Sequence, residues 1–473
     1  MKYTSVIGLE IHAELLTESK VFCRCKNAFG GEPNTRVCPV CSGMPGALPV
    51  LNKNAVTLAV KAGLCLDCKI NKLSSFDRKN YFYPDLPKAY QITQQEKPVC
   101  YDGFVTTAGK KIRINRIHIE EDAGKLIHDE NNGVTLIDFN RCGVPLIEIV
   151  TEADFRTADE VCGFIEEVCL RLKYAGVCNA RLEEGSLRVD VNISVMPEGS
   201  RRFGTRAEIK NLNSLKSVSR AIAYEAQRQS ELLESGATVI QETRRFDEAT
   251  GKTFVMRSKE DSRDYRYFPE PDLPQIYISQ EDIEEIRKTL PQMPGERFLR
   301  YVNDFGLPSE EAALIVKNKE FSDFYDEAAE CFSDYRGLAN MMLGELNRHL
   351  NSSGKTISQL KFTPQMLAAL IKMCSEKRIT KNAAKEIFAI MFTSGGNPED
   401  IAAENNLFTE DNTDELTELA KQILSENSDN VKAYKAGKTQ LFGFFMGQVI
   451  RRSEKSASPE TVKEILMKML SEI

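Results

Sequence analysis

Residues 6–15 (VIGLEIHAEL) alternate between apolar and polar side chains, and this pattern constrains the fold more than any other feature of the chain. In an extended strand, successive side chains point to opposite faces. One face therefore carries apolar groups, while the other carries Glu10, His12 and Glu14. Alternate residues lie about 6–7 Å apart along a strand, so these side chains can converge on one cation. A strand whose polar side simply faces solvent explains the same pattern.

The same one-sided alternation recurs in residues 186–195 (SLRVDVNISV) and 204–211 (GTRAEIKN). Such strands are typical of an antiparallel sheet that has one packed face and one open face. The polar side chains that these two segments add to the open face are Arg188, Asp190, Asn192, Arg206, Glu208 and Lys210.

Two more segments add carboxylates to the predicted sheet. Glu148 lies in the otherwise apolar run 146–150 (LIEIV), where an ionised side chain is costly unless a cation or hydrogen bonds compensate for its burial. Residues 117–122 (IHIEED) add His118, Glu120, Glu121 and Asp122. Spacing alone leaves the choice between Glu120 and Glu121 open.

An open face that mixes carboxylates with Arg and Lys suits nucleotide chemistry. Oxygen ligands hold Mg²⁺, and basic side chains neutralise phosphate oxygens. A surface lattice of salt bridges is the alternative interpretation. The sequence Gly-Lys-Thr occurs three times, but the first glycine of a P-loop is replaced each time, by Phe246, His349 or Lys432. Any ATP site must therefore be built on the sheet.

Composition indicates an intracellular globular protein. The chain has 473 residues, a net charge of −7 and 13 cysteines. The charge excludes a uniformly basic nucleic-acid binder but not a local basic patch. An odd, clustered set of cysteines favours metal binding and free thiols in a reducing cytoplasm. We find no signal-peptide pattern and no run of about 18 apolar residues that would predict a membrane span.

The cysteines at the N-terminal end have the spacing of a zinc site. Cys23 and Cys25 are followed, after 12 residues, by Cys38 and Cys41. Two pairs of thiolates on tight turns bring four sulfurs to one tetrahedral centre, which leaves no open coordination position. The spacing therefore predicts a structural Zn²⁺, with free thiols as the alternative.

The chain divides into a strand-rich part and a helical part. The breaker cluster 291–295 (PQMPG) follows the strands, and helical periodicity dominates beyond it. A second boundary falls at 395–398 (GGNP), after which residues 401–430 are acidic and residues 431–473 are basic. This basic module could meet a phosphate backbone, or it could be a solvated helical face; its basic residues include Lys432, Lys435, Lys438, Arg451, Arg452 and Lys455.

Several long motifs resemble those of one family, the B subunits (GatB) of bacterial aspartyl/glutamyl-tRNA amidotransferases. The resemblance runs from the first strand to the C-terminal segments 437–443 (GKTQLFG) and 447–450 (GQVI). Its other motifs, in chain order, are 6–14 (VIGLEIHAE), 76–85 (FDRKNYFYPD), 118–125 (HIEEDAGK), 140–150 (NRCGVPLIEIV), 183–188 (EEGSLR), 208–214 (EIKNLNS), 242–247 (ETRRFD) and 264–274 (DYRYFPEPDLP).

This resemblance implies an α+β fold in three parts. Residues 1–293 would form a cradle domain similar to the glutamine synthetase catalytic fold, with an antiparallel sheet. An all-α domain at 294–400 and a YqeY-like tail at 401–473, which binds tRNA, would follow. It also implies the reaction: ATP and Mg²⁺ serve to phosphorylate the side-chain carboxylate of Glu or Asp misacylated on tRNA(Gln) or tRNA(Asn). Ammonia from a GatA-type amidase partner, held with a small GatC-type subunit in a heterotrimer, then displaces the phosphate.

The resemblance also implies roles for single residues. His12, Glu121 and Glu148 would be catalytic ligands of Mg²⁺, with Glu10 close by, and Cys23, Cys25, Cys38 and Cys41 match the zinc-bearing members. Charge and placement, rather than the resemblance, select the residues for ATP, which are Arg188, Asp190, Arg206, Glu208 and Lys210. The rival hypothesis is a non-catalytic, zinc-containing scaffold that binds tRNA, in which the acidic face is only a lattice of salt bridges.

Overall fold

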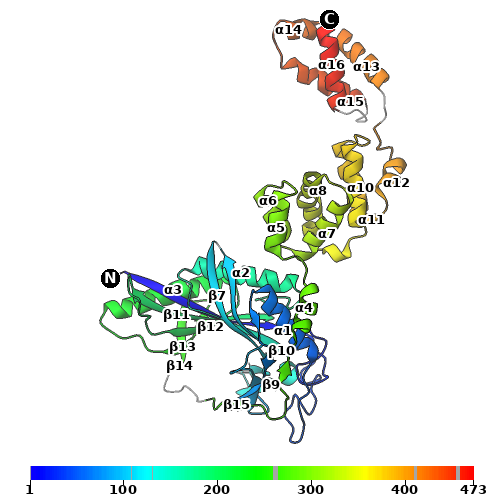
Figure 1. The fold of residues 1–473 in the computed structure, drawn as a ribbon. Coiled ribbons are helices and arrows are strands. Elements are labelled where there is room, and N and C mark those ends of the chain that lie inside the picture. The colour runs from blue at the N-terminus through cyan, green and yellow to red at the C-terminus, as the bar shows by residue number, and fades with distance from the viewer. Residues whose placement is uncertain are drawn as a thin grey trace. The chain divides into compact units, whose positions relative to one another are not determined.

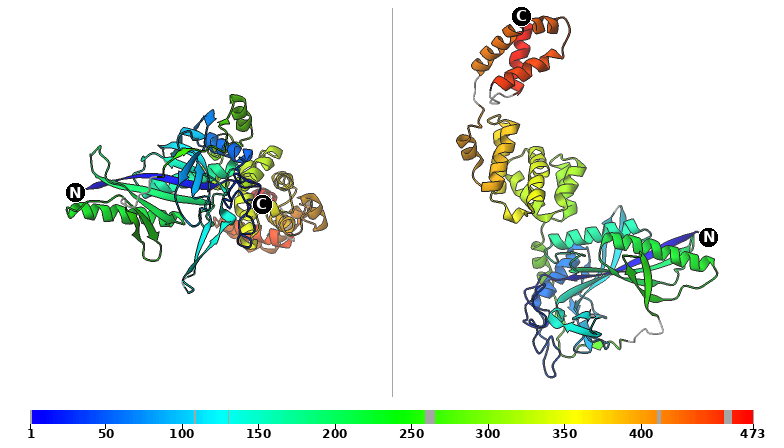
Figure 2. Two further views of the ribbon diagram at one scale, coloured as in Figure 1. Left: turned by 90° about the horizontal axis from the view of Figure 1, so that it is seen from below. Right: turned by 180° about the vertical axis from the view of Figure 1, so that it is seen from behind.

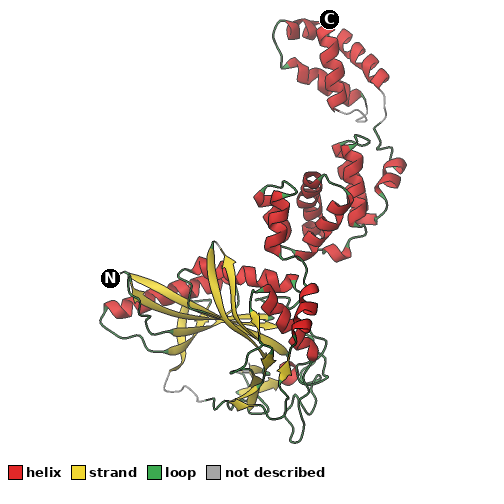
Figure 3. Ribbon diagram, in the orientation of Figure 1, coloured by secondary structure: helices red, strands yellow, loops and turns green. Residues whose placement is uncertain are grey.

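A computed structural model describes residues 2–107, 109–129, 131–258, 265–409, 413–453 and 459–472. The chain forms two compact units, Met1–Pro294 and Gly295–Ile473 (Figure 1). Among the described residues, all the strands lie in the first unit, and the regular elements of the second are helices (Figure 3). The α+β class predicted from the sequence is confirmed.

A nine-stranded sheet dominates the first unit, in the order β14-β13-β12-β11-β1-β10-β7-β6-β2. All neighbouring strands are antiparallel except β12 and β13, which run parallel. The strands are β1 (Tyr3–Glu14), β2 (Lys69–Ile70), β6 (Cys100–Thr107), β7 (Lys110–Glu121), β10 (Pro145–Thr151), β11 (Leu187–Pro197), β12 (Ala207–Leu212), β13 (Glu242–Asp247) and β14 (Lys252–Ser258).

Three small sheets complete the strands of this unit. β15 (Phe268–Pro269), β4 (Asp77–Asn80) and β5 (Tyr90–Thr93) form one, and β5 contacts β7 of the large sheet. The other two are the pairs β16 (Ile276–Tyr277) with β3 (Leu73–Ser74) and β8 (Lys125–Asp129) with β9 (Val134–Asp138). A short 3-10 turn, η1 (Phe139–Arg141), follows β9.

Helices cover the apolar face of the large sheet, as Figures 1 and 2 show. α1 (Lys53–Cys65) contacts β6 and β7, α2 (Ala158–Tyr174) contacts β6, and α3 (Leu215–Glu234) contacts β11, β12 and β14. A fourth helix, α4 (Gln280–Lys288), packs on α1. Ile11, Ile149 and Ile193 are fully buried in this core. The charged side chains therefore project from the opposite face, as the alternation predicts.

The second unit contains two hydrophobic cores. One gathers residues from Tyr301 to Ala402, and the other gathers residues from Leu416 to Leu470. Its helices are α5 (Pro294–Asn303), α6 (Ser309–Val316), α7 (Lys319–Cys331), α8 (Tyr335–Met341), the π-helix η3 (Met342–Leu346), α9 (Asn347–Ser353), η4 (Ile357–Gln359), α10 (Pro364–Ser375), α11 (Lys381–Ser394), α12 (Pro398–Glu404), α13 (Thr413–Glu426), α14 (Ser428–Lys435), α15 (Leu441–Arg452) and α16 (Pro459–Glu472).

The predicted domain boundaries can be compared with these cores. The break after residue 293 lies one residue from the division between the two units. The break after residue 400 falls inside α12, whose residues Ile401 and Ala402 are buried in the first helical core. The segment 204–211 also differs from its prediction, since β12 begins at Ala207 and Arg206 precedes it. None of the helices in the described part of the chain is long and apolar enough to cross a membrane.

A buried ion network joins α3 to the edge of the large sheet. Glu225 is fully buried, and its carboxylate accepts hydrogen bonds from Arg228, Gln229 and Thr253. Arg244 of β13 lies 3.4 Å from the same carboxylate. Breaking such a network on one side leaves buried charge without its partner.

We therefore expect Glu225→Ala to lower the free energy of unfolding of the first unit by about 3–5 kcal/mol. Urea unfolding, followed by amide hydrogen exchange in β11 and β13, measures this loss. Glu231→Ala, on the exposed side of the same helix, is the matched control and should change stability by less than about 0.5 kcal/mol. Equal effects of the two substitutions would contradict the role of the network.

Candidate active site

A cluster of one imidazole and two carboxylates lies on the open face of the large sheet. His12 of β1 pairs with Glu148 of β10 across the central strands, and Glu120 projects to the same face from β7. His12 Nε2 lies 3.3 Å from Glu120 Oε1 and 3.7 Å from Glu148 Oε2. One ligand atom from each residue lies within 4.8 Å of the other two, as a shared cation requires. Register thus places the three groups together.

Burial makes this cluster costly without a compensating charge. The side chains of Glu120 and Glu148 are only 5% and 12% exposed. His118, the neighbour of Glu148 on β7, lies with its Nε2 3.0 Å from Glu148 Oε2. Two buried carboxylates that contact the same imidazole need positive charge between them, from protonated imidazoles or from a metal ion.

His12 and His118 are the imidazoles that can supply that charge. Burial alone would raise the pKa of Glu148, but the charge of His118 and its hydrogen bond lower that pKa to about 2. Burial would lower the pKa of His118, but Glu148 and Glu120 raise it to about 9. The pKa of His12 is also raised, because the hydrogen bond and charge of Glu120 outweigh burial. A divalent cation could replace these protons.

Glu121, which the resemblance implied as a ligand, does not join this cluster. Successive residues of β7 face opposite sides of the sheet, so Glu121 points away from Glu120. Its carboxylate pairs with Lys88 and accepts a hydrogen bond of 3.0 Å from the backbone N–H of Ile92. The structure therefore places Glu120, and not Glu121, beside His12 and Glu148. The role of Glu121 as a ligand stays a prediction.

A second acidic cluster lies beside the first on the same face. Glu10, Asp190 and Glu208 bring one ligand oxygen each within 4.8 Å of one another, from β1, β11 and β12. Lys210 Nζ lies 2.5 Å from Asp190 and 2.8 Å from Glu208, and these charges raise the pKa of Lys210 despite its burial. Burial and the charges of Glu148 and Glu208 raise the pKa of Glu10. Glu10 thus belongs to this cluster rather than to that of His12.

The two predicted arginines have different surroundings. Arg188 pairs with Asp122, at 2.7 Å between Nη2 and Oδ2, and Arg141 lies 3.4 Å from the same carboxylate. Arg206 is exposed and lines a cavity of about 540 Å³. Glu10, Asn192 and Phe203 line the same cavity, which therefore opens beside the second acidic cluster.

The four N-terminal cysteines converge as the spacing predicts. Cys41 Sγ lies 3.9 Å from Cys38 Sγ and 4.0 Å from Cys25 Sγ, and all four sulfurs lie within 4.8 Å of one another. Tetrahedral Zn–S bonds of about 2.3 Å place sulfurs about 3.8 Å apart, so the thiols fit this metal. The buried Lys20 lies 3.5 Å from Cys41 Sγ. Hydrogen bonds from Cys23 and the Cys38 backbone, with the Lys20 charge, lower the pKa of Cys41.

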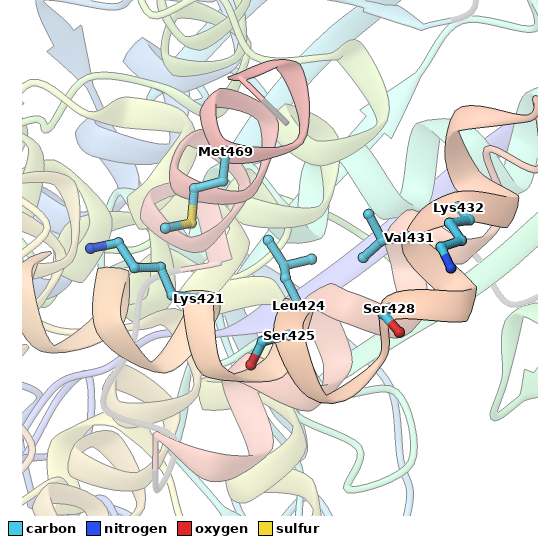
Figure 4. A pocket seen from close by; sticks show the side chains of 7 residues that line it. All are labelled: Lys421, Leu424, Ser425, Ser428, Val431, Lys432 and Met469. Carbon is cyan, nitrogen blue, oxygen red and sulfur yellow. The ribbon is translucent and has the colours of Figure 1, made fainter.

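The basic tail carries a cavity of about 490 Å³. In Figure 4, Lys421 and Lys432 flank an apolar floor formed by Leu424, Val431 and Met469. Arg452 pairs with Glu426 at 2.9 Å, so part of the basic charge is already neutralised within the tail. Lys455 of the basic module and Asp264 of the motif 264–274 lie outside the described residues.

Sequence reasoning left parts of this site unassigned. Strand alternation alone assigns Glu120 to the open face, since Ile117 and Ile119 lie on the apolar face together with Glu121. Asp122, the partner of Arg188, lies beyond the end of β7, where strand alternation no longer determines which way a side chain points.

Cation affinity at the His12 cluster should rise with pH. A metal ligand must be the neutral imidazole, and the pKa of His12 is raised above its ordinary 6.5. Protons therefore compete with the cation at low pH, and His118 adds repulsion until its pKa of about 9. We expect Mg²⁺ or Mn²⁺ to bind at least about tenfold more tightly at pH 8.5 than at pH 6. Titration calorimetry measures this ratio, and an affinity that falls with pH would refute the assignment.

Comparisons with known proteins agree with the motifs. The family model of the GatB/GatE catalytic domain matches residues 5–284, and that of the GatB domain matches residues 323–470. The B subunits of the aspartyl/glutamyl-tRNA(Asn/Gln) amidotransferases from Caldicellulosiruptor saccharolyticus and Thermoanaerobacter pseudethanolicus are 50% and 49% identical to the chain, with both sequences fully covered. The B subunit from Myxococcus xanthus is 47% identical over 99% of each sequence. The chain therefore belongs to the family of aspartyl/glutamyl-tRNA amidotransferase B subunits.

Proposed function

We propose that this protein activates and amidates the side-chain carboxylate of Asp or Glu attached to tRNA(Asn) or tRNA(Gln). The observation that carries this proposal is the open face of the sheet. There, His12, Glu120 and Glu148 form a cluster that could hold a cation, and Lys210 pairs with Asp190 of the neighbouring acidic cluster. We call the first group the cation-binding cluster. The names of the full-length relatives supply the substrate class.

The reaction takes place in two steps. A carboxylate oxygen attacks the γ-phosphorus of ATP, and the bond from that phosphorus to ADP breaks, which gives an acyl phosphate. The nitrogen of ammonia then attacks the acyl carbon, the carbon–oxygen bond breaks, and phosphate leaves as the amide forms. A carboxylate alone resists ammonia, so the first step supplies the leaving group and divides one difficult reaction into two.

His12, Glu120 and Glu148 would hold Mg²⁺ in this scheme, and Glu10 with Asp190 and Glu208 offers a second set of oxygens. When bound, the ion neutralises phosphate charge as it develops during transfer. The cavity beside Arg206 and Phe203 suits a nucleotide, since it combines an aromatic ring and a guanidinium with the adjacent carboxylates. Lys210 and Arg188 provide further positive charge close by.

Ammonia has to come from a partner. A chain that belongs to a family of B subunits implies further subunits, and we propose a glutamine-hydrolysing amidase and a small third subunit, in the cytoplasm. The tail would contact the tRNA through the surface around Lys421 and Lys432. Zn²⁺ at the cysteine cluster would be structural, because four thiolates complete its coordination.

Removal of the charge of Glu148 tests the catalytic function. Glu148→Gln, in the complex with its partner subunits, should reduce tRNA-dependent ADP formation and amidation by about 10²–10³-fold. Glutamine hydrolysis by the partner and tRNA binding should persist, since neither uses this carboxylate. Glu231→Gln, on the exposed side of α3 and outside the site, is the control and should retain amidation. If Glu148→Gln keeps both tRNA binding and amidation, the protein is a scaffold.

The cysteine cluster makes an independent prediction. Purified protein should contain about one equivalent of zinc, and Cys41→Ser should lose most of it, because a serine hydroxyl is a poor ligand for Zn²⁺. Elemental analysis measures the metal content. Cys178→Ser, which replaces a buried thiol outside the cluster, should retain the zinc. Equal zinc content in both variants would contradict the assignment.

A further inference from the structure

Lys79 lies on a different sheet from the residues of the cation-binding cluster. It lies in β4, opposite Gln91 of β5, in the small sheet that packs beside β7. Its Nζ lies 4.9 Å from the centre of the Tyr265 ring. Tyr265 in turn contacts Tyr81 and Tyr267, at 5.9 and 6.0 Å between ring centres. Among the residues that the structure describes, the ammonium is therefore held by an aromatic group.

Within the described part of the chain, the charge of Lys79 has no anionic partner at contact distance. Across the described residues, no hydrogen bond and no carboxylate within 4.0 Å engages its Nζ. By contrast, Lys88 pairs with Glu121 and Lys210 pairs with Asp190. Burial alone would lower the pKa of Lys79, but the charges of Glu120 and Glu148 raise it, so the group stays protonated at neutral pH.

The pairing of β4 with β5 locates Lys79 relative to the cluster. The side chain of Gln91, the cross-strand neighbour of Lys79, donates a hydrogen bond of 2.7 Å to the backbone carbonyl of Glu121, the residue after Glu120. The negative charges of Glu120 and Glu148 raise the pKa of Lys79. Burial, together with the same two charges, raises the pKa of Tyr267. Lys79 and its aromatic group thus face the carboxylates that would hold Mg²⁺. An anion that enters between them meets positive charge from both sides, whereas a cation or a neutral group meets no complementary charge from Lys79.

We propose that Lys79 is a catalytic residue that binds the phosphoryl acceptor, the side-chain carboxylate of the aminoacyl group. This inference rests on the proposed function, and it names the side chain that binds the phosphoryl acceptor. One oxygen of the carboxylate attacks the γ-phosphorus, and the bond from phosphorus to ADP breaks. The other oxygen stays on the ammonium of Lys79, which orients the attack and keeps its own proton throughout.

The same contact serves the second step. When ammonia adds to the acyl carbon, the electron pair of the carbonyl moves to the oxygen that Lys79 holds. The oxyanion then reforms the carbonyl, the bond from carbon to the phosphate oxygen breaks, and phosphate leaves with that electron pair. The nitrogen gives its surplus proton to solvent. A fixed cation at the oxyanion stabilises the transition state on both sides of this intermediate.

The assembled complex with Lys79→Met tests the proposal. ADP formation that depends on Glu-tRNA(Gln) or Asp-tRNA(Asn) should fall about 10²–10³-fold. Trapping of the acyl phosphate by hydroxylamine should fall in parallel, while ATP binding and glutamine hydrolysis stay normal. Lys79→Arg, which keeps the charge, should recover at least about tenfold of the lost rate. Lys111→Met, which removes another lysine held over a ring, that of Phe104 at 3.6 Å, should behave as wild type.

The outcomes separate this inference from the proposed function. Normal ADP and hydroxamate formation in Lys79→Met, with amidation lost, would overturn the proposal. Lys79 would then act in the delivery of ammonia and not in phosphoryl transfer. Full activity in Lys79→Met, with activity lost in Glu148→Gln, would overturn it and leave the function intact. Full activity in both variants would overturn the function itself. If Lys79→Met is poorly folded by circular dichroism, the Lys79→Gln and Lys79→Arg pair decides, and equal loss in both refutes a role for charge.

Discussion

The register of β1 between β10 and β11 is the constraint on which the rest of the structure depends. Strand alternation sends Ile11 into the core and His12 to the open face, and pairing aligns His12 with Glu148 and Arg188. A slip of one residue would bury the imidazole and expose the core of the unit. The same hydrophobic pattern that stabilises the sheet therefore sets the positions of the site residues.

That register also places the buried carboxylates of the site against two imidazoles. Glu120 and Glu148 are nearly buried, and the charge and hydrogen bond of His118 hold the pKa of Glu148 low in spite of this burial. Because the folded-state pKa of His118 is raised to about 9, the stability from this charge is present below its ordinary pKa of 6.5. It is lost as the pH rises toward about 9, which is also the range in which a metal ion replaces the protons most easily.

Most of the first unit follows from local periodicity, and so the open-face residues of β1, β10 and β11 could be predicted. The period assigns Glu120 to the open face and Glu121, with Ile119, to the packed face, whereas the resemblance implies Glu121 as the ligand. Lys79 is a different case, because β4 belongs to a second sheet and tertiary packing alone brings that sheet beside β7. Likewise, the parallel pairing of β12 with β13 depends on the crossover through α3, which strand patterns do not encode.

If the protein has the proposed function, the open face of the sheet must be shielded from water during the reaction. An acyl phosphate is lost to water unless the site excludes it. His12 is 21% exposed, so water reaches the imidazole in the free chain, although the carboxylates beside it are nearly buried. The bound nucleotide and the acceptor end of the tRNA would lie over this face, between the cation-binding cluster and Lys79. Exclusion of water would then accompany substrate binding, and the acyl phosphate would form only when the group that ammonia must attack is already enclosed.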